Sequence, residues 1–340
     1  MRNERATKLL LDKLSKHRPT VLLLGQSYLG SPPAKNAFLK SIAEHFQLNL
    51  ESNEYPLDQL TTKLDKLDLS AELRYLHRRS ESIPISEALH NISEFAWSNI
   101  FTSAIDEVWT RAFKKPWRSL RSVFTEKTWP FEARDPNQLC SSFLFGCIDK
   151  EDEDCRIPAD AFVLDERRQT AVALLRRLPE ITTPIGVVLI EGYDPAYDWL
   201  KSRDLYPVLN SLGSEQVFLF SEDESVQRDK YLSKLHSDGK LLFVDSSVSA
   251  ILKTATEAGV IRFGDPAIKL PAGRQITIDN FPQPIPKEYW QNLNGIASIL
   301  DDNLVMPPVQ LTGEIQYMDY RNFLADPVRP NDWSGFGRGY

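Results

Sequence analysis

The chain has 340 residues, of which 42% are hydrophobic and 26% are charged, as in an ordinary globular protein with a sizeable core. Its net charge of −7 provides no overall attraction to nucleic acid or to an anionic membrane, so we expect neither as a direct partner. No apolar run approaches the length of a membrane span, and the N-terminus has no apolar stretch typical of a signal peptide. These features predict a cytoplasmic protein.

Helix and strand patterns alternate through residues 1–260. In the first half, helices are predicted at 6–16, 37–48, 60–79, 86–97 and 105–113, and strands at 20–25, 98–103, 122–126 and 141–146. The second half alternates more regularly, with strands at 185–194, 216–223 and 240–247 and helices at 166–178, 195–203, 225–236 and 248–259. Strands rich in Val, Leu and Phe, separated by helices, are typical of βαβ units. We therefore predict an α/β fold with a doubly wound, mostly parallel, Rossmann-like sheet.

The alternation stops near residue 260. Nine of the 22 prolines fall within the last 80 residues, where one helix at 287–303 and a strand within 308–323 are predicted. We divide the chain into an α/β domain, 1–260, and an appended Pro-rich segment, 261–340. The glycine-rich end at 332–340 indicates a linker that leads into a further domain.

The three cysteines, Cys140, Cys147 and Cys155, match no zinc-binding spacing, and no histidine lies near them in the sequence. Their low, odd number favours a reducing compartment and buried, inert thiols. The acidic run at 149–155 is most simply a solvated loop. We therefore predict no metal site.

Four predicted strands end in polar or glycine-containing turns: 25–30 (GQSYLG), 101–106 (FTSAID), 144–149 (LFGCID) and 191–198 (EGYDPAYD). In doubly wound folds, ligands bind at the carboxyl ends of the strands. The first turn is placed like a nucleotide phosphate loop, but Gln26 and Tyr28 put bulk where close approach needs glycine. A plain connecting turn and a degenerate dinucleotide loop both remain open. The sequence GxxxxGK[ST] does not occur in the chain, so it holds no P-loop of its own.

The order and spacing of these four turns resemble the sirtuin-like domains of bacterial defence proteins, over residues 1 to about 260. That family has a GAG-x-S loop, a T-T-N-x-D turn, a strand that ends in His-Gly, and a later strand that ends in G-Y-x-x-x-D. The matching residues are Gly25, Thr102, Ser103, Asp106, Gly146, Gly192 and Tyr193, with Asp194 or Asp198 as the final acid.

Two departures from the family pattern concern its catalytic positions. Ala104 stands where active members have an asparagine that orients water or the ribose, and Phe145 stands where they have a histidine that acts as general base. Acid–base assistance of this kind contributes roughly 10²–10⁴-fold in rate. The resemblance therefore implies a catalytically degenerate module with no catalytic residues at these positions.

The resemblance also implies a place for NAD or ADP-ribose. The residues expected to line it are Gly25, Gln26, Ser27, Thr102, Ser103, Asp106, Gly146, Gly192 and Asp194. A homo-oligomer and a fused or partner P-loop ATPase are implied as well, with a role in assembly, scaffolding or nucleotide sensing in antiphage defence or signalling. The alternatives are an active NAD hydrolase whose catalytic groups lie elsewhere and an interaction module without a ligand. Thr102, Ser103 and Asp106 would in that last case only cap the following helix.

Overall fold

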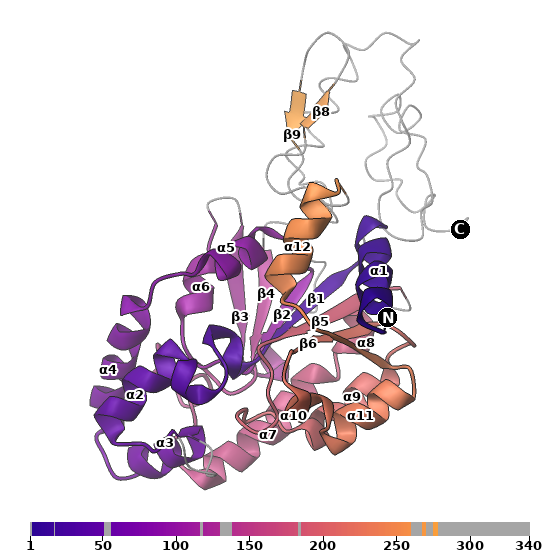
Figure 1. The fold of residues 1–340 in the computed structure, drawn as a ribbon. Coiled ribbons are helices and arrows are strands. Elements are labelled where there is room, and N and C mark those ends of the chain that lie inside the picture. Colours follow the sequence, from indigo (N-terminus) through magenta and orange to yellow (C-terminus); the bar gives the residue numbers. More distant parts are fainter. Residues whose placement is uncertain are drawn as a thin grey trace. The chain divides into compact units, whose positions relative to one another are not determined.

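Seven parallel strands form the sheet of the first unit of the chain, in the order β3-β4-β2-β1-β5-β6-β7 (Figure 1). The computed structural model describes residues 2–16, 18–50, 56–115, 118–129, 138–182, 185–259, 267–269 and 275–277. The strands are β1 (Thr20–Leu24), β2 (Asn99–Thr102), β3 (Ser119–Val123), β4 (Gln138–Phe143), β5 (Val187–Glu191), β6 (Val217–Phe220) and β7 (Leu241–Val244). This arrangement confirms the predicted Rossmann-like α/β fold.

The central strands are buried along their whole length, which explains their continuous apolar sequences. Every residue of β1, β2 and β6 is buried, as expected when helices cover both faces of a parallel sheet. Strand β1 pairs with β2 on one side and with β5 on the other, with Leu24 opposite Thr102 and Glu191. Because all seven strands run in the same direction, their carboxyl ends meet at one edge of the sheet.

Two groups of helices flank the sheet. Helix α12 packs against α1 and α5, and α5 packs against α6; on the other side α9 packs against α7, α8 and α11. In Figure 1 the first group lies above the sheet and the second below it. The helices are α1 (Arg2–Ser15), α2 (Ala37–Phe46), α3 (Pro56–Leu64), α4 (Leu69–Ser82), α5 (Glu87–Glu94), α6 (Val108–Phe113), α7 (Ala161–Leu175), α8 (Leu178–Thr182), α9 (Ser202–Ser211), α10 (Glu224–Gln227), α11 (Lys230–Ser237) and α12 (Val248–Glu257).

Short polar side chains cap many of these helices and set where they begin. Each cap accepts a hydrogen bond from a backbone N–H in the first turn, which satisfies a donor that has no partner within the helix. The capping residues are Asn36, Asp68, Ser86, Asp160, Asp223, Asp229 and Ser247.

Some predicted helix boundaries are wrong. Residues 195–200 form turns rather than a helix, and α9 begins only at Ser202 and continues through Pro207. The predicted helix at 225–236 is divided into α10 and α11, because Asp229 caps the second helix. The polar stretch 60–79 likewise separates into the end of α3 and most of α4.

The chain divides into two units, Met1–Ile261 and Arg262–Tyr340. In the second unit, β8 (Ala267–Lys269) pairs antiparallel with β9 (Gln275–Thr277). The helix predicted at 287–303 and the strand predicted within 308–323 lie outside the described residues. Among the described helices, none is long and apolar enough to cross a membrane.

Candidate functional site

The junction of β1 and β5 is the point at which the strand order reverses. From β1 the chain builds β2, β3 and β4 on one side of the sheet and then returns to build β5 on the other side. In doubly wound folds, a ligand binds in the crevice that this reversal opens at the carboxyl ends of the strands. The turns that begin with Gly25 and Gly192 meet at this point.

These two turns are in direct backbone contact. A Cβ atom on Gly25 would lie 2.3 Å from the carbonyl oxygen of Gly192, and one on Gly192 would lie 2.3 Å from the backbone nitrogen of Tyr28. Gly192 also has a φ of +66°, in the left-handed region. The close approach of the two turns therefore requires glycine at both positions, whether or not a ligand binds there.

The carboxylate of Asp198 lies between the turn that follows β1 and the turn that follows β2. Its Oδ2 accepts hydrogen bonds from the backbone N–H of Gln26 at 3.0 Å and from the hydroxyl of Ser103 at 2.6 Å, and its Oδ1 accepts one from the backbone N–H of Leu200 at 2.9 Å. We call these three donors the carboxylate seat. The Asp198 residue is only 1% exposed. Burial raises its pKa to about 6, against the opposing effect of the bonds from Ser103 and Gln26.

The first three backbone N–H groups of the first turn donate to protein oxygens. Gly25 N–H donates to the carbonyl of Glu191 and Ser27 N–H to that of Gly192, both at 2.8 Å, while Gln26 N–H donates to Asp198. A bound pyrophosphate needs such N–H groups free to face its oxygens. In this conformation these three N–H groups are not free to face the pyrophosphate of NAD or ADP-ribose. Binding of either nucleotide here stays a prediction, and it requires Asp198 to leave the seat.

The turn after β2 is buried and bonded internally. Thr102 Oγ1 donates to the carbonyl of Leu24 and accepts from the N–H of Ala104, both at 3.0 Å. Asp106 Oδ1 accepts from the N–H of Val108 at 3.0 Å, at the start of α6, and from the hydroxyl of Tyr28. Burial raises the pKa of Asp106 to about 6. These bonds position the loop, and the Ala104 side chain adds no polar atom to it.

The turn after β4 places Phe145 in the core. Phe145 is 1% exposed, and its ring centroid lies 5.6 Å from that of Trp199. Gly146 follows with a φ of +77°, and a Cβ there would lie 2.2 Å from the carbonyl oxygen of Arg156. The position compared above with the histidine of sirtuin-like domains is therefore occupied by an apolar ring in van der Waals packing.

The turn after β5 is stabilised by its own residues. Tyr193 donates its hydroxyl proton to the carbonyl of Leu200 at 2.9 Å, and Asp194 Oδ1 accepts from the N–H of Ala196 at 2.9 Å. Burial raises the pKa of Asp194. The Asp194 carboxylate thus caps a local turn.

A cavity of about 470 Å³ opens beyond this turn, at the carboxyl ends of β5, β6 and β7. Ser27, Gly192 and Asp194 line it, so it brings together three of the residues predicted to bind NAD. None of the described residues that line it is a lysine or an arginine. Its lining also carries five carboxylates, those of Glu191, Asp194, Glu222, Asp223 and Asp245. Desolvation raises the pKa of Glu191 to about 7. Such a wall repels the phosphates of a nucleotide.

The predicted residues that do not line this cavity have other tasks. Gln26 and Ser103 hold Asp198 in the carboxylate seat, whereas Thr102, Asp106 and Gly146 stabilise neighbouring turns. Sequence reasoning missed Tyr28, which joins the first turn to Asp106, and Trp199, which packs on Phe145. Only the place of Tyr28 in the turn that follows β1 marked it in the sequence.

No protein-family model matches the chain, and no curated protein matches it significantly. The resemblance to sirtuin-like domains therefore depends on the motif residues, and it stays a prediction.

Proposed function

We propose that the chain is a catalytically inactive sirtuin-like module that acts in assembly or scaffolding within a bacterial defence or signalling protein. The observation that carries the proposal is the carboxylate seat, in which Asp198 occupies the donors at the β1–β5 junction. A carboxylate in this position performs the electrostatic task that a ligand phosphate performs in a nucleotide-binding relative. In this way the Asp198 side chain, rather than a ligand, satisfies the three donors at the β1–β5 junction.

The two catalytic positions support the same proposal. Ala104 and Phe145 are both 1% exposed, and neither side chain can transfer a proton or orient water. Tyr28, in the first turn, and Asp106, in the turn after β2, bond to each other and to the start of α6. Burial raises the pKa of Tyr28 far above its usual value, so this hydroxyl is not a general base near neutral pH.

The hydrogen bonds of Asp198 and the acidic cavity favour an assembly role over nucleotide sensing. Sensing requires a nucleotide to displace Asp198 from three hydrogen bonds and to approach a cavity lined by carboxylates. We therefore propose a homo-oligomer, or an assembly with a fused or partner P-loop ATPase, in the cytoplasm.

A test by mass spectrometry separates this proposal from the active-hydrolase alternative. The purified chain is incubated with NAD at high protein concentration beside a positive-control NAD hydrolase, and NAD, nicotinamide and ADP-ribose are quantified. We expect no nicotinamide above the no-protein control. Release of nicotinamide in proportion to protein concentration would overturn the proposal and direct attention to a base other than position 145.

A second measurement addresses ligand binding and assembly. The melting temperature is recorded with NAD and with ADP-ribose for the wild type, for Asp198→Ala and for the exposed control Asp165→Ala. We expect no shift for the wild type or the control. A shift in the wild type without turnover would favour nucleotide sensing instead. Light scattering after size exclusion then measures the oligomeric state that the assembly role requires.

A further inference from the structure

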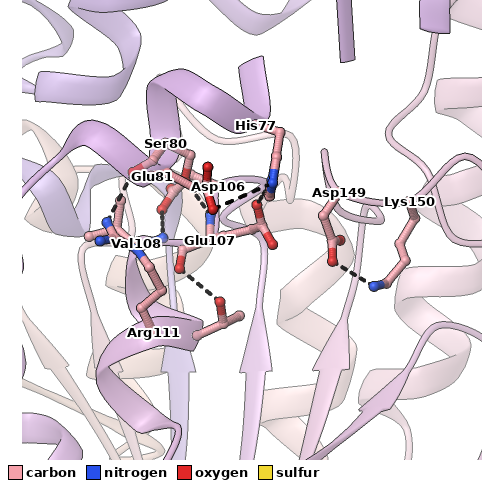
Figure 2. A network of polar contacts seen from close by, with 10 residues as sticks. His77, Ser80, Glu81, Asp106, Glu107, Val108, Arg111, Asp149 and Lys150 are labelled. Carbon is pink, nitrogen blue, oxygen red and sulfur yellow. Dashed lines mark hydrogen bonds and ion pairs between the residues drawn. The ribbon is translucent and has the colours of Figure 1, made fainter. Parts of the chain in front are cut away.

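A second group of polar side chains lies at the carboxyl ends of β2 and β4, away from the carboxylate seat (Figure 2). Glu107 directly precedes α6, in the connection that follows β2, and Cys147 and Asp149 lie in the turn that follows β4. Because β2 and β4 are neighbours in the sheet, their following turns meet. The fold therefore brings together three metal-binding side chains that are as much as 42 positions apart in the sequence.

One donor atom from each of these residues lies within 4.8 Å of the other two. The set consists of a carboxylate oxygen of Glu107, the sulfur of Cys147 and a carboxylate oxygen of Asp149. Cys147 is 1% exposed, yet its thiol faces these two carboxylates rather than only apolar neighbours. The thiol donates a hydrogen bond to the carboxylate of Asp149, which directs the sulfur toward the carboxylates.

The two carboxylates are held from behind by other side chains. His77, on α4, contacts Glu107 through its Nδ1, and the backbone N–H of Glu107 donates to Ser80 Oγ at 2.8 Å. Figure 2 shows Asp149 on the other side of the group, bonded to Lys150 at 2.5 Å. Metal-binding carboxylates are commonly oriented by such hydrogen-bond partners. The arrangement therefore keeps both carboxylates close to the thiol before an ion arrives.

We propose that Glu107, Cys147 and Asp149 bind a divalent transition-metal ion, with Zn²⁺ as the expected species and one coordination position open to water. Zn²⁺ accepts mixed sulfur and oxygen ligands, at about 2.3 Å and about 2.0–2.2 Å respectively, and sites with three protein ligands keep a fourth position open. These lengths require the three donor atoms to draw together by roughly 1 Å on binding, which rotation of the two carboxylate side chains provides.

Metal binding also accounts for the charges of the group. The Cys147 S–H bond breaks as the sulfur–metal bond forms, and the proton is released to solvent. One thiolate and two carboxylates then surround an ion of charge +2, so the two carboxylates, which repel each other in its absence, are both attracted to it. From the sequence we predicted no metal site, because we considered only the spacing of the cysteines. That spacing could not reveal this group, because the ligands come from two separate turns.

The test uses the full chain and does not depend on the proposed scaffolding role. The protein is stripped with a chelator, and its Co²⁺ complex is recorded by absorption spectroscopy, since Co²⁺ replaces Zn²⁺ and reports a thiolate ligand through a charge-transfer band. Zn²⁺ binding is then measured by calorimetry. We expect one equivalent of metal and a thiolate band for the wild type.

The variants decide whether the metal occupies this group. Cys147→Ser is expected to abolish the thiolate band, and Asp149→Asn and Glu107→Gln to weaken Zn²⁺ binding at least tenfold. The matched controls Cys140→Ser and Glu151→Gln, at a cysteine of β4 and an exposed acid beside the turn, are expected to match the wild type. Circular dichroism checks that each variant is folded, and the Asp149 variant, changed at an exposed position, serves if Cys147→Ser does not fold. Absence of a stoichiometric metal, or binding that the Cys147, Asp149 and Glu107 variants leave unchanged, would overturn the proposal.

Discussion

Replacing Asp198 with asparagine removes a buried negative charge from the carboxylate seat while keeping nearly the same side-chain shape. The asparagine oxygen can still accept from Gln26 and Ser103, whereas its amide group faces the N–H of Leu200. The loss of the third bond lowers stability by an amount that does not vary with pH. The change in charge has a separate effect that does vary with pH.

The pH-dependent effect can be worked out from the pKa of Asp198. Burial raises this pKa from 3.8 to about 6 in the folded protein. Between these values the folded protein holds a proton that the unfolded chain has lost, so the unfolding free energy of the wild type falls as the pH rises. The full effect is about 3 kcal/mol, at 1.36 kcal/mol for each pKa unit. About 2 kcal/mol of it develops between pH 4.5 and pH 7.5.

The measurement is urea unfolding of the wild type and Asp198→Asn at several pH values across this range. The variant has no titrating group at this position, so its unfolding free energy is expected to rise relative to that of the wild type by about 2 kcal/mol from pH 4.5 to pH 7.5. Asp165→Asn is the control, because Asp165 is an exposed acid, with a 71% exposed side chain. Its difference from the wild type is expected to change by less than about 0.5 kcal/mol, as is usual at the surface.

Two results would refute this reasoning. Parallel pH curves for the wild type and Asp198→Asn would mean that the carboxyl group titrates as it does in the unfolded chain. A wild type that gains stability over the variant with rising pH would mean that the three donors outweigh the cost of burial. In the second case, the seat would stabilise an anion more strongly than we infer.

Three further predictions concern the same edge of the sheet. The double substitution Ala104→Asn with Phe145→His introduces the two catalytic side chains of sirtuin-like domains, yet we expect no nicotinamide release by mass spectrometry, since the carboxylate seat stays filled; turnover would contradict this. Gly192→Ala is expected to lower the unfolding free energy in urea by about 4 kcal/mol or to prevent folding, because its Cβ would lie 2.3 Å from a backbone nitrogen. Gly239→Ala, with a similar φ of +68° and open space around it, should cost only about 1–2 kcal/mol, and equal costs would refute the argument from close contact. Asn36→Ala removes a buried cap that accepts two N–H bonds at 3.0 Å and is expected to cost about 2–3 kcal/mol in the same assay; a loss below 1 kcal/mol would show that water replaces it.

The predictions that succeeded depended on burial along single strands. The runs around β1, β5 and β6 are continuously apolar because helices cover both faces of the sheet, and this pattern needs no knowledge of neighbouring elements. The helix predicted at 195–203 failed for the opposite reason. Its first residues are held as turns by Asp194 and Asp198, which bond to Ala196 and Leu200, and this local competition overrides an apolar pattern.

By itself, the sequence determined the α/β alternation, the parallel sheet and the four turns at the ends of its strands, since each depends on residues close together in the chain. Only the tertiary structure decided what those turns do. The bonds from Gln26 and Ser103 to Asp198 span 172 and 95 positions, and the group of Glu107, Cys147 and Asp149 forms only because β2 and β4 are adjacent. Contacts between distant segments depend on strand order, and strand order is set by how the whole sheet packs.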